Sequence, residues 1–341
     1  MVLKRLKIGL IGWGPYGENL ARVALNTLRA EIPLVWTRSK GTAEKIVAAG
    51  FNPTNDVDEL INSPEVEAVI VASPNSLHKE HVLKVCAAKK ALWAEKPLVL
   101  NLADYDEIIN AIKDSGILTH LNFSKRNGPV YRKMKELKEN GSLGEIMHIV
   151  KVDRRGTGLY NLGSPHKAVT NPDLSGGWLI HHMCHQVDFV TALSGQKIKK
   201  VYCRTVKSSP ECPSEESIAA ILTAENGSVF ELSDGVGPQS ENYVSVLGSN
   251  GLAKNTQGTT INYRGFDKEN KAFYGQGGNS VLFTPEGYGD DSMQAFTAAV
   301  LGMEPDTNYP VEVIPVEKGR HVLEVLLAMR ESAESGNPVE F

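Results

Sequence analysis

Residues 6–17 read LKIGLIGWGPYG, an apolar stretch that runs directly into three glycines. The apolar residues Leu6–Ile11 predict a short buried strand, and the amphipathic segment Glu18–Leu28 after the glycines predicts a helix. A strand, a glycine-rich turn and a helix in this order are typical of the first unit of a parallel α/β sheet. This stretch therefore decides the fold class of the N-terminal part of the chain.

The three glycines form the pattern G-x-G-x-x-G. Gly12 allows a tight turn, Gly14 lets the backbone approach a pyrophosphate, and Gly17 allows the helix to pack closely on the strand. The phosphates then lie at the positive end of the helix, where we also expect Tyr16 to contact the cofactor. Such glycines also occur in an ordinary βα turn, but the strand and helix around them favour a nicotinamide dinucleotide.

The first third of the chain continues this alternation of strand and helix. The predicted strands are Pro33–Trp36, Val66–Ala72, Ala91–Ala94 and Ile117–Asn122, and the predicted helices are Thr42–Ala49, His78–Ala88 and Asp104–Ser115. This alternation predicts an α/β domain with a doubly wound parallel sheet, a Rossmann domain, over residues 1–122.

After Asn122 the pattern changes, because strand-like segments now follow one another closely. The predicted strands are Glu145–Val152, Lys199–Thr205, Ser217–Thr223, Val229–Leu232 and Tyr243–Leu247, and the predicted helices are Val130–Glu139, Trp178–Leu193 and Val316–Ser335. We therefore predict a second, α+β domain over residues 123–341, built on a mostly antiparallel sheet.

Composition excludes several classes of protein. Hydrophobic content of 41% and charged content of 22% are ordinary for a globular protein, and a net charge of −4 gives no electrostatic reason to expect nucleic acid or membrane as a partner. The four cysteines include no CxxC pair and indicate reduced thiols. The N-terminal apolar run is cut short by Gly12 and Gly14, so we expect no signal peptide and a cytoplasmic protein.

The residues after the second predicted strand bear on the choice of cofactor. An acidic residue there would accept hydrogen bonds from the adenosine ribose and repel a 2′-phosphate. This chain has Thr37, Arg38, Ser39 and Lys40 instead, two cations and two hydroxyls around the place of a 2′-phosphate. The pattern favours NADP, while a guanidinium stacked on adenine would also be compatible with NAD.

Two polar stretches follow neighbouring strands of the predicted parallel sheet, at the edge where such sheets bind ligands. Residues 73–78 read SPNSLH, and residues 95–97 read EKP. Lys96 can give or take a proton if burial and a positive nicotinamide ring lower its pKa. One lysine in a turn is otherwise a solvated charge.

Longer motifs carry a resemblance to a known family. They are SPNSLHKEHVLKVCAAKKALWAEKP at 73–97, LKENGSLGEI at 137–146, SGGWLIHHMCHQVDF at 175–189 and GSNG at 248–251. With the glycine turn, they make the chain similar to the glucose–fructose oxidoreductase / inositol dehydrogenase family (Gfo/Idh/MocA) over almost its full length.

The resemblance implies a Rossmann domain followed by an open-faced, mostly antiparallel sheet, with substrate bound near the nicotinamide. Lys96 matches the catalytic lysine of the family, and the matching positions that line the cofactor are Pro74, Asn75, His78 and Glu95. In its second domain the family usually carries an Asp and, four residues later, a His. His185 matches that His, whereas His181 stands where the Asp is usual.

His181, His185 and Asp188 have the spacing i, i+4 and i+7, which predicts one face of a helix. We expect Lys96 to bond the reacting oxygen, and His185 to act as base in oxidation and acid in reduction. His181 would share that task or bind a hydroxyl group, and Asp188 would orient an imidazole or have a structural role. A metal site that also used Cys184 is disfavoured, because no glutamate lies between the histidines as in HExxH.

Polar residues that could bind substrate cluster between the first strand of the second sheet and this helix. They are Arg154, Arg155, Tyr160, Asn161, His166 and Lys167. Arg155 and Tyr160 are the preferred pair, and Trp178 or Tyr160 would supply an aromatic platform for a sugar ring.

The function that the resemblance implies is an NAD(P)-dependent dehydrogenase or reductase acting on a secondary alcohol or ketone of a sugar, polyol, glycoside or cyclitol. One alternative is a glycosidase-type enzyme that keeps NAD bound and acts by transient oxidation and elimination. Another is a non-catalytic dinucleotide-binding regulator, although the presence of Lys96 and His185 argues against it. The resemblance also implies a homodimer or homotetramer.

Overall fold

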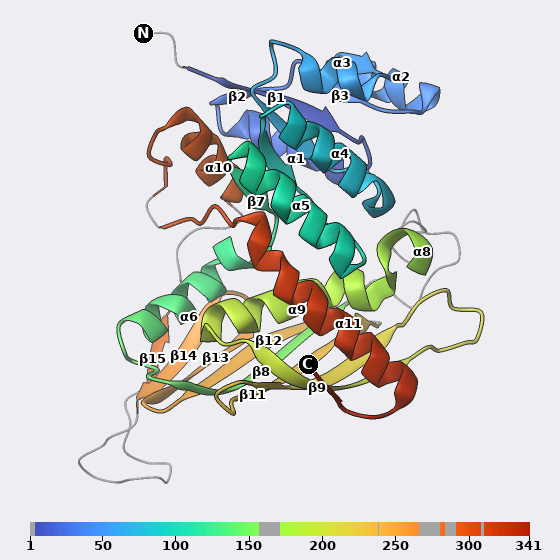
Figure 1. The fold of residues 1–341 in the computed structure, drawn as a ribbon. Helices are drawn as coiled ribbons and strands as arrows, with labels where there is room; N and C mark the ends of the chain where they lie inside the picture. The colour runs from blue at the N-terminus through green and yellow to red at the C-terminus, as the bar shows by residue number, and fades with distance from the viewer. Residues whose placement is uncertain (1–3, 157–170, 238, 266–279, 284–290, 308–309) are drawn as a thin grey trace. The chain divides into compact units, whose positions relative to one another are not determined.

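The computed structural model describes residues 4–156, 171–237, 239–265, 280–283, 291–307 and 310–341 (Figure 1). Its contacts group the chain into two compact units. The first comprises Met1–Ser124, Asp173–Ser175 and Asp290–Leu323, and the second comprises Lys125–Pro172, Gly176–Gly289 and Glu324–Phe341. None of the described helices is both long enough and apolar enough to cross a membrane.

The first unit contains a seven-stranded sheet in which every pair of neighbouring strands is parallel. The strand order is β4-β3-β1-β5-β6-β7, and β2 also pairs with β1. The strands are β1 (Leu6–Ile11), β2 (Ala30–Glu31), β3 (Val35–Trp36), β4 (Pro53–Thr54), β5 (Ala68–Val71), β6 (Ala91–Ala94) and β7 (Thr119–Leu121). The predicted Rossmann-type parallel sheet is therefore confirmed.

The helices between these strands are α1 (Pro15–Asn26), α2 (Lys40–Ala48), α3 (Val57–Asn62), α4 (His78–Ala87) and α5 (Leu102–Ser115), with the 3₁₀ turn η1 (Asn75–Leu77) before α4. Helix α1 begins at Pro15, three residues before the predicted start at Glu18. Proline is well suited to the first turn of a helix, because its missing N–H would have no partner there.

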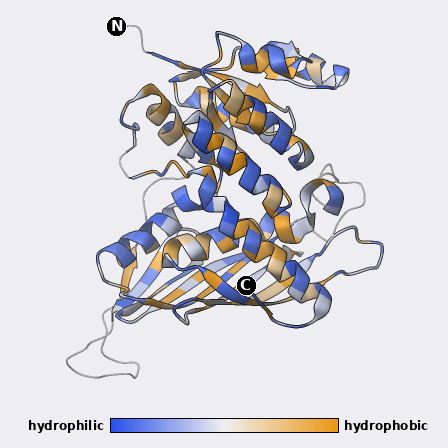
Figure 2. Cartoon of the chain, in the orientation of Figure 1, coloured by the Kyte–Doolittle hydropathy of each residue, from blue (hydrophilic) through white to orange (hydrophobic). Residues whose placement is uncertain are grey.

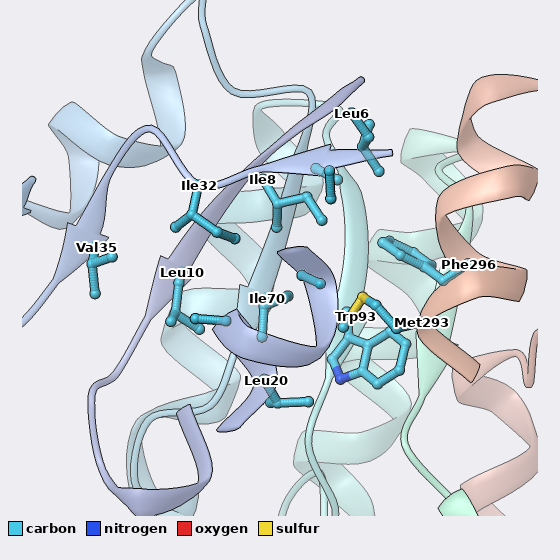
Figure 3. Close-up of a cluster of buried hydrophobic side chains, with 14 of the residues drawn as sticks. Leu6, Ile8, Leu10, Leu20, Ile32, Val35, Ile70, Trp93, Met293 and Phe296 are labelled. Atoms are coloured by element: carbon cyan, nitrogen blue, oxygen red, sulfur yellow. The ribbon is translucent and has the colours of Figure 1, made fainter. Parts of the chain in front are cut away.

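The core of the first unit gathers around β1, β5 and β6 and is completed by a segment from far along the chain. Figure 3 shows Met293 and Phe296, from α10 (Ser292–Leu301), beside Trp93 of β6. The rings of Trp93 and Phe296 meet edge to face with centroids 5.6 Å apart. Further along, Leu121 donates a backbone hydrogen bond to the carbonyl oxygen of Ile314 at 2.8 Å.

This return of the chain explains why Asp290–Leu323 belongs to the first unit, whereas the sequence assigned all of 123–341 to a second domain. Tyr105 of α5 donates a hydrogen bond to the Val316 carbonyl oxygen at 2.7 Å, and Arg320 pairs with Asp106. These contacts join residues more than 200 positions apart, which no local pattern predicts.

The second unit contains a nine-stranded sheet of order β15-β14-β13-β12-β8-β11-β10-β9-β16. Strands β8 and β11 run parallel and all other pairs are antiparallel. The strands are β8 (Ile146–Arg155), β9 (Ile198–Val206), β10 (Ser217–Ala224), β11 (Val229–Val236), β12 (Glu241–Gly248), β13 (Gly251–Gln257), β14 (Thr260–Gly265), β15 (Ser280–Phe283) and β16 (Val339–Glu340). The predicted mostly antiparallel sheet is confirmed.

Helix α9 (Gly177–Ser194) packs on one face of this sheet, against β8 and β11. The remaining described helices are α6 (Pro129–Glu139), the short α8 (Pro172–Ser175) and α11 (Gly319–Ser335), with the 3₁₀ turns η2 (Ser124–Asn127) and η3 (Val316–Lys318). Most of α8, all of η3 and the start of α11 belong to the first unit. Exposed and buried residues alternate along β10, and Figure 2 shows hydrophilic and hydrophobic residues mixed along the strands of this sheet. Such alternation is expected when one face of a sheet lies on a core.

Replacing Phe296 with Ala should destabilise the first unit by about 3–5 kcal/mol, because the substitution leaves a cavity against Trp93. Thermal unfolding of purified protein measures the effect, with Val47→Ala as control, since Val47 is 60% exposed in α2. An unfolding temperature that falls equally in both variants would contradict the role given to α10.

Candidate active site

The glycine turn between β1 and α1 has the geometry that a bound pyrophosphate needs. Gly12 has φ of +106°, and a side chain there would meet the carbonyl oxygen of Ala72 at 2.6 Å. A side chain at Gly17 would collide with the carbonyl oxygen of Gly12. At Gly14, by contrast, no atom lies within 4 Å of the place of a Cβ, and no side chain caps α1. The helix end is therefore open to an anion, and the residues present fit a dinucleotide.

The turn after β3 is held by its two hydroxyl residues. The buried Thr37 side chain accepts a hydrogen bond from the Ser39 amide at 3.3 Å, and Ser39 caps α2 by accepting one from the Thr42 amide at 3.3 Å. The side chains of Arg38 and Lys40 are exposed. Thr37 and Ser39 therefore shape the turn, and the two cations are left available to a ligand.

The loops after β5 and β6 are tied together by two of the residues matched to the family. The Asn75 side-chain amide donates to the Pro97 carbonyl oxygen. The buried ring of His78 lies with Nε2 at 2.7 Å from the Ser73 carbonyl oxygen and Nδ1 at 3.0 Å from that of Leu98. Burial lowers the pKa of His78. Asn75 and His78 thus hold the Lys96 loop from inside the protein, whether or not they also touch the cofactor.

Lys96 is 8% exposed and is followed by a cis peptide bond to Pro97. Its neighbour Glu95 accepts hydrogen bonds from the Asn122 side chain at 2.7 Å and the Trp93 indole at 3.3 Å. Burial raises the pKa of Glu95 to about 7, against the opposing effects of these donors and of the Lys96 charge. A lysine and a carboxyl group that titrates near neutrality therefore lie side by side at the end of β6.

Pro74, another residue matched to the family, lies at the N-cap of η1.

In the second unit, α9 carries His181, His185 and Asp188. His185 is buried and His181 is half-buried. Asp188 is fully buried and forms a bidentate ion pair with Arg126, whose Nε lies 2.9 Å from Oδ2 and 3.1 Å from Oδ1. The carboxylate is thus neutralised by a partner 62 positions away in sequence, a long-range contact that helical spacing could not reveal. Lys96 belongs to the first unit and the histidines to the second, so their association in one site remains a prediction.

Trp178, considered above as a sugar platform, is 6% exposed and already has partners. Its ring stacks on His182 with centroids 3.9 Å apart, and its indole N–H donates to Asp234 Oδ1 at 2.8 Å. Asp234 also accepts from the Gln186 amide at 2.6 Å, and burial raises its pKa to about 6. This geometry favours a structural role for Trp178, as an anchor of α9 on the sheet.

Asp234 was not identified from the sequence as a residue of this region, although it shares its strand face with the buried Phe230 and Leu232.

The remaining predicted substrate residues are only partly described. Arg155 is exposed at the end of β8, while Arg154 points to the opposite face and pairs with Glu241 and Ser233. The other residues of that set lie outside the described residues: Tyr160, Asn161, His166 and Lys167. Within the described ranges, no group of three or more His, Cys, Asp or Glu residues is arranged to hold a metal ion.

Comparison with known proteins agrees with this architecture. Residues 6–123 match the model for the oxidoreductase family with an NAD-binding Rossmann fold, and residues 131–254 match the model for the GFO/IDH/MocA C-terminal domain. Together the two models account for more than half of the chain.

Individual relatives are more distant. An oxidoreductase of Bacillus subtilis, YrbE, is 25% identical over 270 residues, which is 76% of each chain. The myo-inositol 2-dehydrogenase of Thermotoga maritima is 31% identical over 202 residues, 58% of this chain and 57% of that protein.

A solved levoglucosan dehydrogenase, in complex with NADH and levoglucosan, superposes with a TM-score of 0.83 at 20% identity, covering 99% of both chains. That similarity establishes the fold, and the two family models establish the descent. The chain belongs to the Gfo/Idh/MocA family of oxidoreductases, with an NAD-binding Rossmann domain followed by the family's C-terminal domain.

Proposed function

We propose that this protein is a dehydrogenase or reductase that transfers hydride between NAD(P) and a carbon bearing a secondary hydroxyl or keto group in a sugar, polyol, glycoside or cyclitol. The observation that carries the proposal is the open helix end at Gly14, together with a buried lysine at the end of β6 in the same unit. The names of the Thermotoga and levoglucosan relatives support the substrate class.

The proposed mechanism assigns one task to each residue. When bound, the nicotinamide ring would accept hydride from the substrate carbon in oxidation and supply it in reduction. Lys96 would bond the reacting oxygen and hold it against the ring, and His185 would take the hydroxyl proton in oxidation and return it in reduction. His181 would bind a neighbouring hydroxyl group or share the proton. Burial of Lys96 and His185 supports these tasks, because electrostatic interactions strengthen where water is excluded.

We propose NADP as the preferred cofactor. The side chains of Arg38 and Lys40 are exposed beside a turn whose hydroxyls are already used, so both cations are available to a 2′-phosphate. The Arg38 guanidinium lies 6.0 Å from the centroid of the Trp36 ring, which orients it near the expected adenine end of the cofactor.

We also propose self-association through the face of the second sheet that is opposite to α9. That face exposes Tyr202, Val206 and Ile221, and it is hollowed by a depression of about 420 Å³ between Arg154, Arg204 and neighbouring residues. A homodimer or homotetramer in the cytoplasm is the expected form, and the four free cysteines support that location.

Lys96→Met should lower kcat/KM on the identified substrate by about 10²- to 10⁴-fold, because it removes the group that bonds the reacting oxygen. The dissociation constant of the cofactor should stay within about twofold. Lys113→Met, at an exposed lysine of α5, is the matched control. Full activity in Lys96→Met would refute the mechanism, and turnover without net cofactor reduction would favour transient oxidation instead.

Arg38→Ala should weaken NADPH binding by about tenfold or more, because one charge-assisted hydrogen bond to the phosphate is lost. Binding of NADH should change by less than about twofold. Fluorescence titration of both cofactors measures this, with Lys45→Ala as a control at an exposed lysine of α2, the helix that follows the turn. Wild-type protein that binds NADH more tightly than NADPH would overturn the proposed preference.

A further inference from the structure

Lys151 is a buried lysine for which the proposed mechanism has no use. It lies in the middle of β8, on the face of the sheet that carries the core, and is 4% exposed. Its neighbours across the strands are Leu232 of β11 and Val244 of β12, both buried and apolar. Burial in this setting lowers the pKa of Lys151 to about 8. The side chain is therefore still mostly protonated at neutral pH.

The ammonium group of Lys151 is poorly satisfied by the protein. Its Nζ lies 5.1 Å from the centroid of the Phe189 ring, a weak cation–π contact. Among the residues described, none makes a hydrogen bond to this nitrogen, which has three N–H donors. A nearly buried cation without an acceptor is unfavourable, so such a group is usually paired or binds a ligand.

The nearby carboxylates already have other partners. Asp153 lies 3.6 Å from the Lys125 ammonium, and Asp234 accepts hydrogen bonds from Trp178 and Gln186. Both act on Lys151 only as charges through space.

Charges of both signs lie around Lys151. Asp153, Asp234 and Lys125 act on its ammonium through space, and Arg155 acts in the same way on Asp234. Counted together with Lys151 itself, these are three cations and two carboxylates, so one further carboxylate would balance them.

The ammonium of Lys151 lies on the side of α9 that carries His185, one of the residues proposed to transfer the proton. Phe189, over which its ammonium lies, is four residues after His185 and hence on the same side of α9. The acidic residue of α9 is Asp188, which is neutralised by Arg126. This helix therefore presents no uncompensated negative charge that would repel an anion beside His185.

We propose that Lys151 binds a carboxylate of the substrate, so that the protein acts on sugar acids, either aldonic or uronic, in preference to neutral sugars. This inference rests on the proposed function and names the substrate class of the same site. The carboxylate would supply the acceptors that the ammonium lacks, and it would place the hydroxyl to be oxidised at a fixed distance from Lys151.

Matched ligand pairs test the proposal: D-glucuronate with D-glucose, D-galacturonate with D-galactose, and D-gluconate with D-glucitol. Calorimetric titration into the complex of wild-type protein with NADPH should show at least one acid bound about tenfold or more tightly than its neutral partner. In Lys151→Met and Lys151→Gln, that acid should bind about 10- to 100-fold more weakly, while the neutral partner changes by less than about twofold. Lys254→Met, at an exposed lysine of β13, should keep the wild-type preference.

The wild-type comparison does not depend on the folding of any variant. If no acid is preferred over its neutral partner, or if the Lys151 variants weaken both ligands equally, the inference is wrong. Its failure is distinguishable from failure of the proposed function. The latter would appear as absence of nicotinamide cofactor binding in a separate titration, or as absence of cofactor reduction with every sugar, sugar acid, polyol and cyclitol tested.

Discussion

The close approach of the backbone at Gly12 to the end of β5 is the constraint on which the rest of the structure depends. Gly12 has φ of +106°, and a Cβ at this position would lie only 2.6 Å from the Ala72 carbonyl oxygen, so only glycine fits here. This contact lets the chain turn from β1 into α1 beside β5 while both strands stay in one parallel sheet. It also leaves the N-terminus of α1 uncapped above Gly14, which makes the same turn an anion site.

Two sets of hydrogen bonds hold the residues to which the proposed mechanism assigns the reaction. In the first unit, Asn75 and His78 bond the carbonyl oxygens of the Lys96 loop, so that the lysine is held by the loop after the neighbouring strand. In the second unit, Asp234 binds both Trp178 and Gln186 and thereby fixes the rotation of α9. Both sets use polar side chains that hydrogen-bond between different elements, and such bonds specify one arrangement more sharply than apolar packing does. The histidines and the lysine are thus rigidly presented, each within its own unit.

The sequence was sufficient for the features that depend on local pattern. The strands and helices follow from periods of two and 3.6 residues, and both sheet types were predicted from the order of these elements along the chain. Contacts between distant residues were not predictable in this way. The return of α10 to pack Phe296 on Trp93 and the pairing of Asp188 with Arg126 depend on tertiary structure alone.

The position of Lys151 was partly predictable from local pattern. The alternation along β8 places it on the same face of the strand as Ile149 and Asp153. The alternation does not reveal that its ammonium lacks hydrogen-bond acceptors within the described structure. That depends on the neighbouring strands and on α9, which are distant in sequence. The shifted pKa of Glu95 likewise required its three-dimensional surroundings, because burial, and not sequence context, causes it.

The most direct measurement of the central claim is the absorbance of reduced nicotinamide when the purified protein is mixed with oxidised cofactor and a panel of sugars, sugar acids, polyols and cyclitols. A dehydrogenase should give steady, stoichiometric cofactor reduction with at least one of these compounds, and the reverse reaction when the ketone product and reduced cofactor are supplied. A protein that binds the cofactor but reduces it with none of them, or that converts a glycoside with no net change in the cofactor, would contradict the claim that it is a dehydrogenase.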